Sequence, residues 1–139
     1  MINVKQLAHV CIFARDVEET RRFYEDVMGL ETVFNFTRDG RIFGFYVKAG
    51  GRTFVEVFEN PSASYSGSNQ INHMCLEVDS MADAVAHIRG AGIEVSEPRK
   101  ACDNTTQAWV DDPNGVKIEL FEYSDQSAQF VGGDREADW

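Results

Sequence analysis

The chain has 139 residues, 43% of them hydrophobic, so it is long enough for one domain that buries its own core without disulfides. Its 13 basic and 23 acidic residues give a formal net charge of −10, which disfavours binding to nucleic acid or to an anionic membrane surface. The three cysteines lack a secreted-type spacing, no signal-like run opens the sequence and no apolar stretch is long enough to span a bilayer. These features predict a soluble, cytoplasmic protein.

An internal repeat organises the sequence, because an offset of about 64 residues aligns its two halves. Segments 7–13 and 71–77 both have the composition of strands, and each contains His-x-Cys. Asp16 and Ser80 follow them as N-cap candidates, each with an acidic residue three positions on, and predict two amphipathic helices. The expected ends of these helices are Gly29 and Gly92.

Three further strands are expected in each half, which predicts an α+β protein built from two β-α-β-β-β modules. The expected strands are 31–37, 41–48, 52–58, 93–97, 105–111 and 115–122. The modules span 5–59 and 70–123 within a single domain of residues 1–123, and a Ser-rich linker over 60–70 joins them. Residues 124–139 are expected to form a loosely held polar tail, although Phe130 and Trp139 are candidates for docking.

Two imidazoles and two carboxylates occupy matched places in the halves: His9 and Glu56 are 47 positions apart, and His73 and Glu119 are 46 apart. Alternation along strands places all four opposite apolar rows that would pack under the helices. A buried carboxylate without a partner is costly, and a metal ion removes that cost. Four such ligands leave positions open in the shell of a divalent transition ion, so the sequence predicts a metal site that performs chemistry.

The same strand faces provide candidates for the wall of a substrate pocket. Cys11 and Cys75 are expected to be small wall residues rather than nucleophiles. Gln107 and Trp109 combine an amide with an aromatic ring, which suits a polyol or keto sugar, and a solvated strand face is the alternative. The full set of predicted pocket residues is Cys11, Phe13, Phe54, Cys75, Gln107, Trp109, Lys117 and Phe121.

Two segments, Phe-Tyr-Glu-Asp-Val-Met-Gly-Leu over 23–30 and Asp-Pro-Asn-Gly-Val-Lys-Ile-Glu-Leu over 112–120, carry a resemblance that extends over about residues 5–123. The chain resembles the vicinal oxygen chelate superfamily, also called the glyoxalase/bleomycin resistance/dioxygenase superfamily. The resemblance implies a cup-shaped mixed sheet around one divalent ion (Ni, Co, Mn, Fe or Zn). It also implies a homodimer, with the metal site closed within one chain or between two. The residues at the family's ligand positions are His9, Glu56, His73 and Glu119.

This ligand set resembles that of glyoxalase I, which implies a metal-dependent lyase or isomerase that acts through an enediolate on a small substrate with vicinal oxygens. Glu119 is the first candidate for the catalytic base and Glu56 the second. The alternatives are an epimerase of a small keto compound (a cyclitol ketone, keto sugar or acyl-CoA) and a metal-free protein that binds a drug or metabolite. Bacterial glyoxalase I has an arginine where this chain has Phe13, which argues against glutathione as co-substrate. The candidate replacements are Arg15, Arg38 and Arg41.

Overall fold

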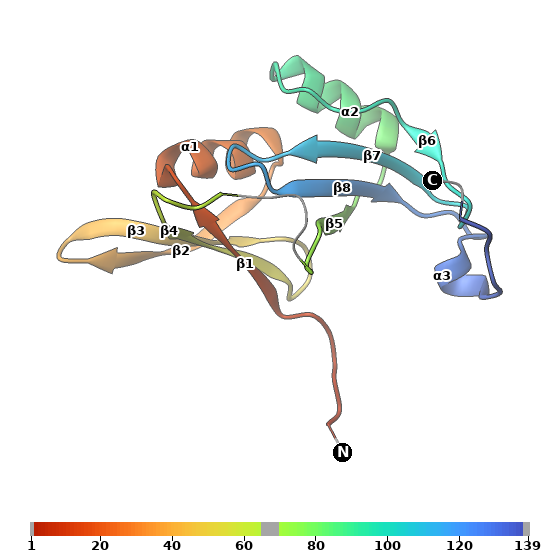
Figure 1. The fold of residues 1–139 in the computed structure, drawn as a ribbon, viewed down its shortest axis with the longest axis horizontal. Helices are drawn as coiled ribbons and strands as arrows, with labels where there is room; N and C mark the ends of the chain where they lie inside the picture. Colours follow the sequence, from red (N-terminus) through yellow and green to blue (C-terminus); the bar gives the residue numbers. More distant parts are fainter. Residues whose placement is uncertain (1, 65–69, 138–139) are drawn as a thin grey trace. The chain divides into compact units, whose positions relative to one another are not determined.

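The computed structural model describes residues 2–64 and 70–137. The chain divides into two compact units: unit 1 is Met1–Gly67 with Asp112–Gly115, and unit 2 is Ser68–Asp111 with Val116–Trp139. Each unit contains one four-stranded sheet of mixed direction (Figure 1), which confirms the predicted α+β class. Part of the expected linker, residues 65–69, lies outside the described residues. In the described part of the chain, no helix combines the length and apolar character that crossing a membrane requires.

In unit 1 the strands lie in the order β1-β4-β3-β2, with β1 parallel to β4 and the other neighbours antiparallel. The order along the chain is the predicted β-α-β-β-β, and the strand bounds lie within about two residues of those expected, the usual precision at element ends. The strands are β1 His9–Ala14, β2 Glu31–Arg38, β3 Arg41–Lys48 and β4 Phe54–Glu59.

The helix of unit 1 begins where expected. The Asp16 carboxylate accepts the backbone N–H groups of Glu18 and Glu19, so it caps α1 (Val17–Arg22). The helix continues into one π-helical turn, η1 (Phe23–Val27), and ends before Gly29, whose φ of +67° a glycine adopts without strain. Figure 1 shows α1 over one face of the sheet. The buried residues of this core include Ile12, Ala14, Val17, Thr20, Phe23, Tyr24, Phe45, Val47, Val55 and Val57.

A turn from the second half of the sequence, Asp112–Gly115, belongs to unit 1. The Tyr24 hydroxyl donates to Asp112 Oδ2 at 3.2 Å, and Asn114 Nδ2 donates to Thr20 Oγ1 at 3.0 Å. The Arg15 backbone N–H donates to Asn114 Oδ1 at 2.9 Å. Burial, with the neighbouring Asp112 carboxylate, raises the pKa of Tyr24 well above its usual range. The motif that carried the family resemblance is therefore part of a buried polar network.

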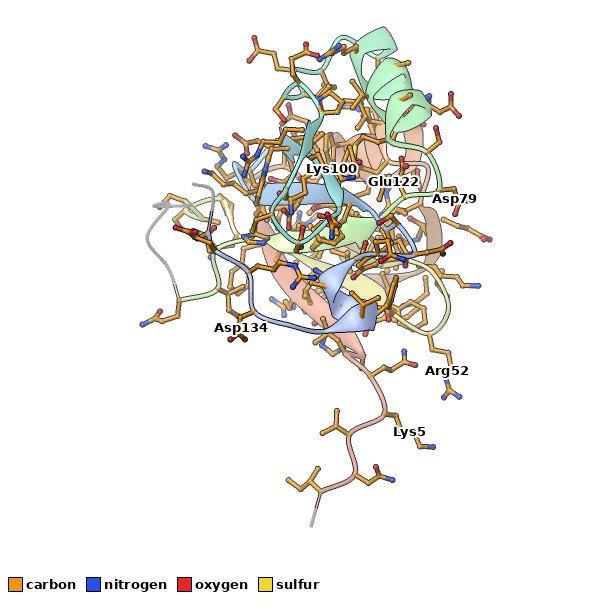
Figure 2. The ribbon with its side chains drawn as sticks, turned by 90° about the vertical axis from the view of Figure 1, so that its right-hand side faces the viewer. Lys5, Arg52, Asp79, Lys100, Glu122 and Asp134 are labelled. Atoms are coloured by element: carbon orange, nitrogen blue, oxygen red, sulfur yellow. The ribbon has the colours of Figure 1, made fainter. Side chains whose placement is uncertain are left out.

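In unit 2 the strands lie in the order β5-β8-β7-β6, with β5 parallel to β8. The helix α2 (Met81–Gly90) begins at the predicted N-cap Ser80 and contacts β7 and β8. The carboxylate of Glu122, labelled in Figure 2, accepts the backbone N–H of Met81 and so satisfies a further free donor of the first helical turn. The strands are β5 Met74–Glu77, β6 Arg99–Lys100, β7 Thr106–Asp111 and β8 Lys117–Glu122.

The strand predicted over 93–97 is wrong. In its place there is one isolated bridge between Val95 and Val110, and regular pairing with β7 resumes at Arg99 and Lys100. Pro98 separates the two: it has no N–H to donate to a ladder and it restricts the residue before it. The apolar alternation over 93–97 is typical of a strand. Pro98 cannot donate a ladder hydrogen bond, and the regular pairs with β7 lie after it, at Arg99 and Lys100.

The segment after β8 is held more closely than the expected loose tail. Residues Ala128–Val131 form the short helix α3, and the Ala128 backbone N–H donates to the Asp103 carbonyl at 2.8 Å. Gln129 Nε2 donates to the Asp103 carboxylate at 2.7 Å. Phe130 lies 4.8 Å from the Tyr123 ring, so it docks while remaining exposed. Trp139 lies outside the described residues.

Candidate metal centre

Unit 1 brings together the first predicted ligand pair. His9 opens β1, and Glu56 lies in the middle of the parallel neighbour β4. The distance from His9 Nε2 to Glu56 Oε2 is 3.9 Å, and the His9 side chain is 43% exposed against 19% for Glu56. The pair therefore lies at an accessible surface of the sheet, with its polar atoms facing each other.

Unit 2 brings together the second pair in the same way. His73 lies immediately before β5, and Glu119 lies in the parallel neighbour β8. The distance from His73 Nε2 to Glu119 Oε2 is 3.4 Å. His73 Nδ1 is 3.0 Å from Asn72 Oδ1. In the tautomer that donates the Nδ1 proton to Asn72, Nε2 is unprotonated, and its lone pair is available to a metal ion beside Glu119. Glu119 is the more buried of the two carboxylates, with a side-chain exposure of 10%.

The strand register explains why the two pairs match. Cys11 lies directly across from Glu56, and Cys75 lies directly across from Glu119. Since each cysteine follows its histidine by two residues, His-x-Cys places the imidazole diagonally beside the carboxylate on the same sheet face. On the other side of each carboxylate the antiparallel neighbours are Tyr46 in unit 1 and Trp109 in unit 2.

Both histidine rings contact the aromatic residue in that row. The His9 and Tyr46 rings have centroids 5.8 Å apart, and the His73 and Trp109 rings 4.9 Å apart, each in an edge-to-face arrangement. Such contacts hold an imidazole in one orientation, which favours ligation through a fixed nitrogen. Trp109 was a predicted pocket residue, whereas Tyr46 was missed. The register of the predicted strands 41–48 and 52–58, joined by a short Gly-rich turn, would have identified it.

The two cysteines are protonated thiols at neutral pH. Partial burial, together with the Glu56 carboxylate, raises the pKa of Cys11 to about 11. Partial burial and Glu119 raise the pKa of Cys75 to about 12. Because the thiolate is the nucleophile and the soft metal ligand, both thiols are weak nucleophiles and weak ligands at neutral pH.

The distances within each pair suit a shared ion. Two ligands that each lie about 2.1 Å from an ion are roughly 3.0 Å apart at an octahedral angle and roughly 3.4 Å apart at a tetrahedral angle. The separations of 3.9 Å and 3.4 Å need little adjustment to reach these values. Among residues 2–64 and 70–137, no three histidine, cysteine, aspartate or glutamate side chains gather closely enough to hold an ion. Each unit by itself therefore offers two ligands of the predicted four.

The remaining predicted pocket residues lie in several environments. Phe13 is 53% exposed, and Phe54 and Gln107 are half-buried, whereas Phe121 is buried against Tyr123. Lys117 is exposed, and its register partner on the neighbouring strand of the β7–β8 ladder is Asp111. It lines an open groove of about 940 Å³ together with Arg89, Glu97 and Trp109. The Gln107 amide already has a partner within unit 2, because its Nε2 donates to Thr105 Oγ1 at 3.1 Å.

All three arginines proposed to replace the missing glutathione-binding residue are engaged in unit 1. Arg15 donates to the Pro113 carbonyl at 2.9 Å, and Arg41 forms two hydrogen bonds with the Glu59 carboxylate. The Arg38 guanidinium lies 4.4 Å from the Phe43 ring centroid. Each of these three side chains therefore already has a partner within unit 1.

Comparison with known proteins identifies the family. Residues 6–120 match the model of the Glyoxalase/Bleomycin resistance protein/Dioxygenase superfamily. The chain belongs to this superfamily. The match covers both units, so the resemblance noted in the sequence is confirmed over most of its expected extent.

Relatives within the superfamily have similar lengths. A lactoylglutathione lyase of Salmonella typhimurium (strain LT2) is 30% identical over 128 residues, which cover 86% of this chain and 94% of the relative. The protein YaeR of Escherichia coli (strain K12) is 27% identical over 130 residues, which cover 88% and 99%. The crystal structure of a glyoxalase family protein from Enterococcus faecalis matches with a TM-score of 0.72 at 24% identity and covers 85% of this chain and 98% of that one.

Proposed function

We propose that the protein is a metal-dependent lyase or isomerase of the glyoxalase I type, acting through an enediolate on a small substrate with vicinal oxygens. The observation that carries the proposal is the duplicated pair, in which an imidazole nitrogen faces a carboxylate oxygen at 3.9 Å in unit 1 and at 3.4 Å in unit 2. Four ligands of this kind suit one divalent transition ion, Ni, Co, Mn, Fe or Zn, with positions left for substrate. The 30% identity to a lactoylglutathione lyase supports the same reaction class.

Within this proposal His9, Glu56, His73 and Glu119 would hold the ion. The ion, when bound, supplies positive charge for two neighbouring oxygens of the substrate. Glu119 is the preferred base, because its carboxylate is the less exposed and lies between Cys75 and Trp109, where little water reaches it. It would take a proton from one carbon and return it to the adjacent carbon, so the substrate is isomerised without a redox partner. Glu56 is the second candidate.

Glutathione is not the proposed co-substrate. Phe13 occupies the place of the family's glutathione-binding arginine, and the three candidate replacements are engaged with Pro113, Glu59 and Phe43. The proposed substrate is therefore an α-hydroxy ketone, or the hemithioacetal of a 2-oxo aldehyde with a thiol other than glutathione. An epimerase acting on a small keto compound would use the same base and ion, and substrate screening separates it from a lyase.

The first test is elemental analysis of the purified protein beside His73→Ala. We expect about one tightly held divalent ion per four-ligand set in the wild type and loss of that ion in the variant. A wild type that holds no ion after reconstitution with Ni²⁺, Co²⁺, Mn²⁺, Fe²⁺ and Zn²⁺ would contradict the proposal and favour a metal-free binding protein. Light scattering on the same samples tests the accompanying proposal that the protein is a homodimer.

The second test separates the role of base from the role of ligand, because the metal content of each variant is measured beside its turnover. In Glu119→Gln we expect turnover of hemithioacetals and keto sugars to fall at least about a hundredfold, because an amide cannot accept the proton. Glu31→Gln is the matched control: it makes the same change at an exposed glutamate at the start of β2, and it should change the rate little. If Glu119→Gln retains turnover while Glu56→Gln loses it, the base is Glu56.

A further inference from the structure

Six aromatic side chains form a continuous cluster on the sheet face of unit 1 that carries His9 and Glu56. Neighbouring rings contact one another: Phe34 stacks on Tyr46 with centroids 5.0 Å apart, and Phe36 lies 4.7 Å from Phe58. Tyr46 is also 5.2 Å from Phe54, and Phe43 is 5.7 Å from Phe58. We call this cluster the aromatic wall; its members are Phe34, Phe36, Phe43, Tyr46, Phe54 and Phe58.

The local geometry of β3 assembles the wall. A bulge leaves Phe43 unpaired, since Thr37 lies across from Ile42 and Phe36 lies across from Gly44, and the Phe43 ring joins the cluster. Gly44 leaves room for the Phe58 ring: a Cβ at this position would lie 2.8 Å from Phe58 Cδ1. The wall is thus held in place by the strand, although Phe34 is 44% exposed and the other five rings are half-buried.

The wall is continuous with the candidate metal ligands. Tyr46 lies directly across from Glu56, and its ring contacts His9 at 5.8 Å. Phe13 lies across from Phe58 and extends the apolar surface on β1. If the polar atoms of a ligand were bound at His9 and Glu56, the part of the ligand next to those atoms would therefore contact the aromatic rings. Two stacked rings in line with such a site provide a face for a planar group rather than for a charged, flexible peptide.

We propose that the aromatic wall binds an uncharged aromatic arm of the substrate, so that this enzyme prefers α-hydroxy ketones and hemithioacetals that bear an aryl group next to the two oxygens. The inference rests on the proposed function for the position of the oxygens and goes beyond it by naming the class of the remaining substituent. The wall orients that substituent by stacking, and Phe34 and Tyr46 are its specificity-determining residues.

The test compares two probes that differ only in this substituent. Phenylglyoxylate and pyruvate both carry a carboxylate beside a ketone, and the first has a phenyl ring where the second has a methyl group. Calorimetric titration of the full-length protein, with and without Ni²⁺, should show phenylglyoxylate binding at least about tenfold more tightly. In Phe34→Ala the ratio should fall to about threefold or less. Phe130→Ala, which removes an exposed ring from unit 2, should leave the ratio unchanged.

The outcomes distinguish this inference from the proposed function. A protein that binds Ni²⁺ but takes both probes equally would overturn the aryl preference alone, and one that prefers phenylglyoxylate but binds no metal would overturn the metal-dependent reaction alone. A ratio that Phe34→Ala leaves unchanged rejects the role of the wall, with Phe34→Leu as the second variant if the alanine substitution prevents folding. A change from dimer to monomer in Phe34→Ala would assign the wall to a subunit contact and also overturn the inference.

Discussion

At the scale of single residues, Gly44 has a structural role that no other residue type can fill. A Cβ built on it would lie 2.4 Å from the Val57 carbonyl oxygen and 2.8 Å from the Phe58 ring. The first of these is a backbone atom of the neighbouring strand, which cannot move without breaking the β3–β4 ladder. The glycine is thus required by the close approach of β4 and not by its backbone angles.

We expect Gly44→Ala to lower the free energy of unfolding by about 2 kcal/mol or more, because the strands must separate locally to admit the methyl group. Urea denaturation at neutral pH measures this. Gly90→Ala is the control: nothing lies within 4 Å of its built Cβ at the end of α2, so its effect should be small and of either sign. Equal stabilities for the two variants would show that β3 and β4 adjust freely at this point.

At the scale of elements, the segment around α3 depends on one aspartate. Burial would raise the pKa of Asp103, but hydrogen bonds from Thr105 and Gln129 outweigh it and hold that pKa below its usual value. The ionised carboxylate therefore stabilises the fold above about pH 4, the range of an ordinary aspartate, and this contribution is lost as the pH falls through the lowered folded pKa.

We expect Asp103→Ala to increase proteolytic cleavage within residues 124–131 several-fold at pH 7, because Gln129 and Thr105 lose their acceptor. Limited proteolysis followed by mass spectrometry locates the cuts. Asp125→Ala removes a carboxylate from the same segment, and cleavage there should stay near the wild-type rate. If both variants were cut equally, α3 would be held by its backbone contacts and by Phe130 instead.

Also at the element scale, the repeated pattern was enough to predict most of the fold. His-x-Cys, the N-caps Asp16 and Ser80 and the alternation of β4 and β8 are local signals. They placed the helices and three of the ligand-bearing strands correctly, whereas β5 begins at Met74, one residue after His73. The strand at 93–97 failed because Pro98 acts on pairing with a partner far along the chain. Tyr46 was missed for another reason: its place beside Glu56 follows from the register of two neighbouring strands taken together and not from the alternation within either one. That His9, Glu56, His73 and Glu119 bind one metal ion together stays a prediction.

At the scale of the whole molecule, the Asp112–Gly115 turn is the one segment of the second half of the sequence that is assigned to unit 1. It lies in the second half of the chain yet belongs to unit 1, where Asp112 accepts the Tyr24 hydroxyl at 3.2 Å. Because an unfolded tyrosine ionises near pH 10 and folded Tyr24 keeps its proton to higher pH, the folded state binds more protons above that pH. Stability contributed by this group is thus present below about pH 10 and is lost as the pH rises.

We expect Tyr24→Phe to lower the free energy of unfolding by about 1–2 kcal/mol at pH 7, since Asp112 loses a buried donor. Between about pH 10 and 11 the wild type should lose stability faster than the variant, by up to about 1.4 kcal/mol per pH unit. Urea denaturation at pH 7, 9, 10 and 11 measures both effects. Tyr46→Phe, at a half-buried tyrosine whose own pKa is raised by desolvation and by Glu56, is the control for the loss at pH 7 only. Parallel alkaline losses in wild type and Tyr24→Phe would show that Tyr24 ionises as in the unfolded chain.

The position of that turn also limits how the two halves can diverge in evolution. After a duplication, each copy would ordinarily accumulate substitutions on its own, but here residues 112 and 114 are selected by the packing of residues 20 and 24. Among related sequences we therefore expect loss of the carboxylate at 112 to accompany loss of the hydroxyl at 24.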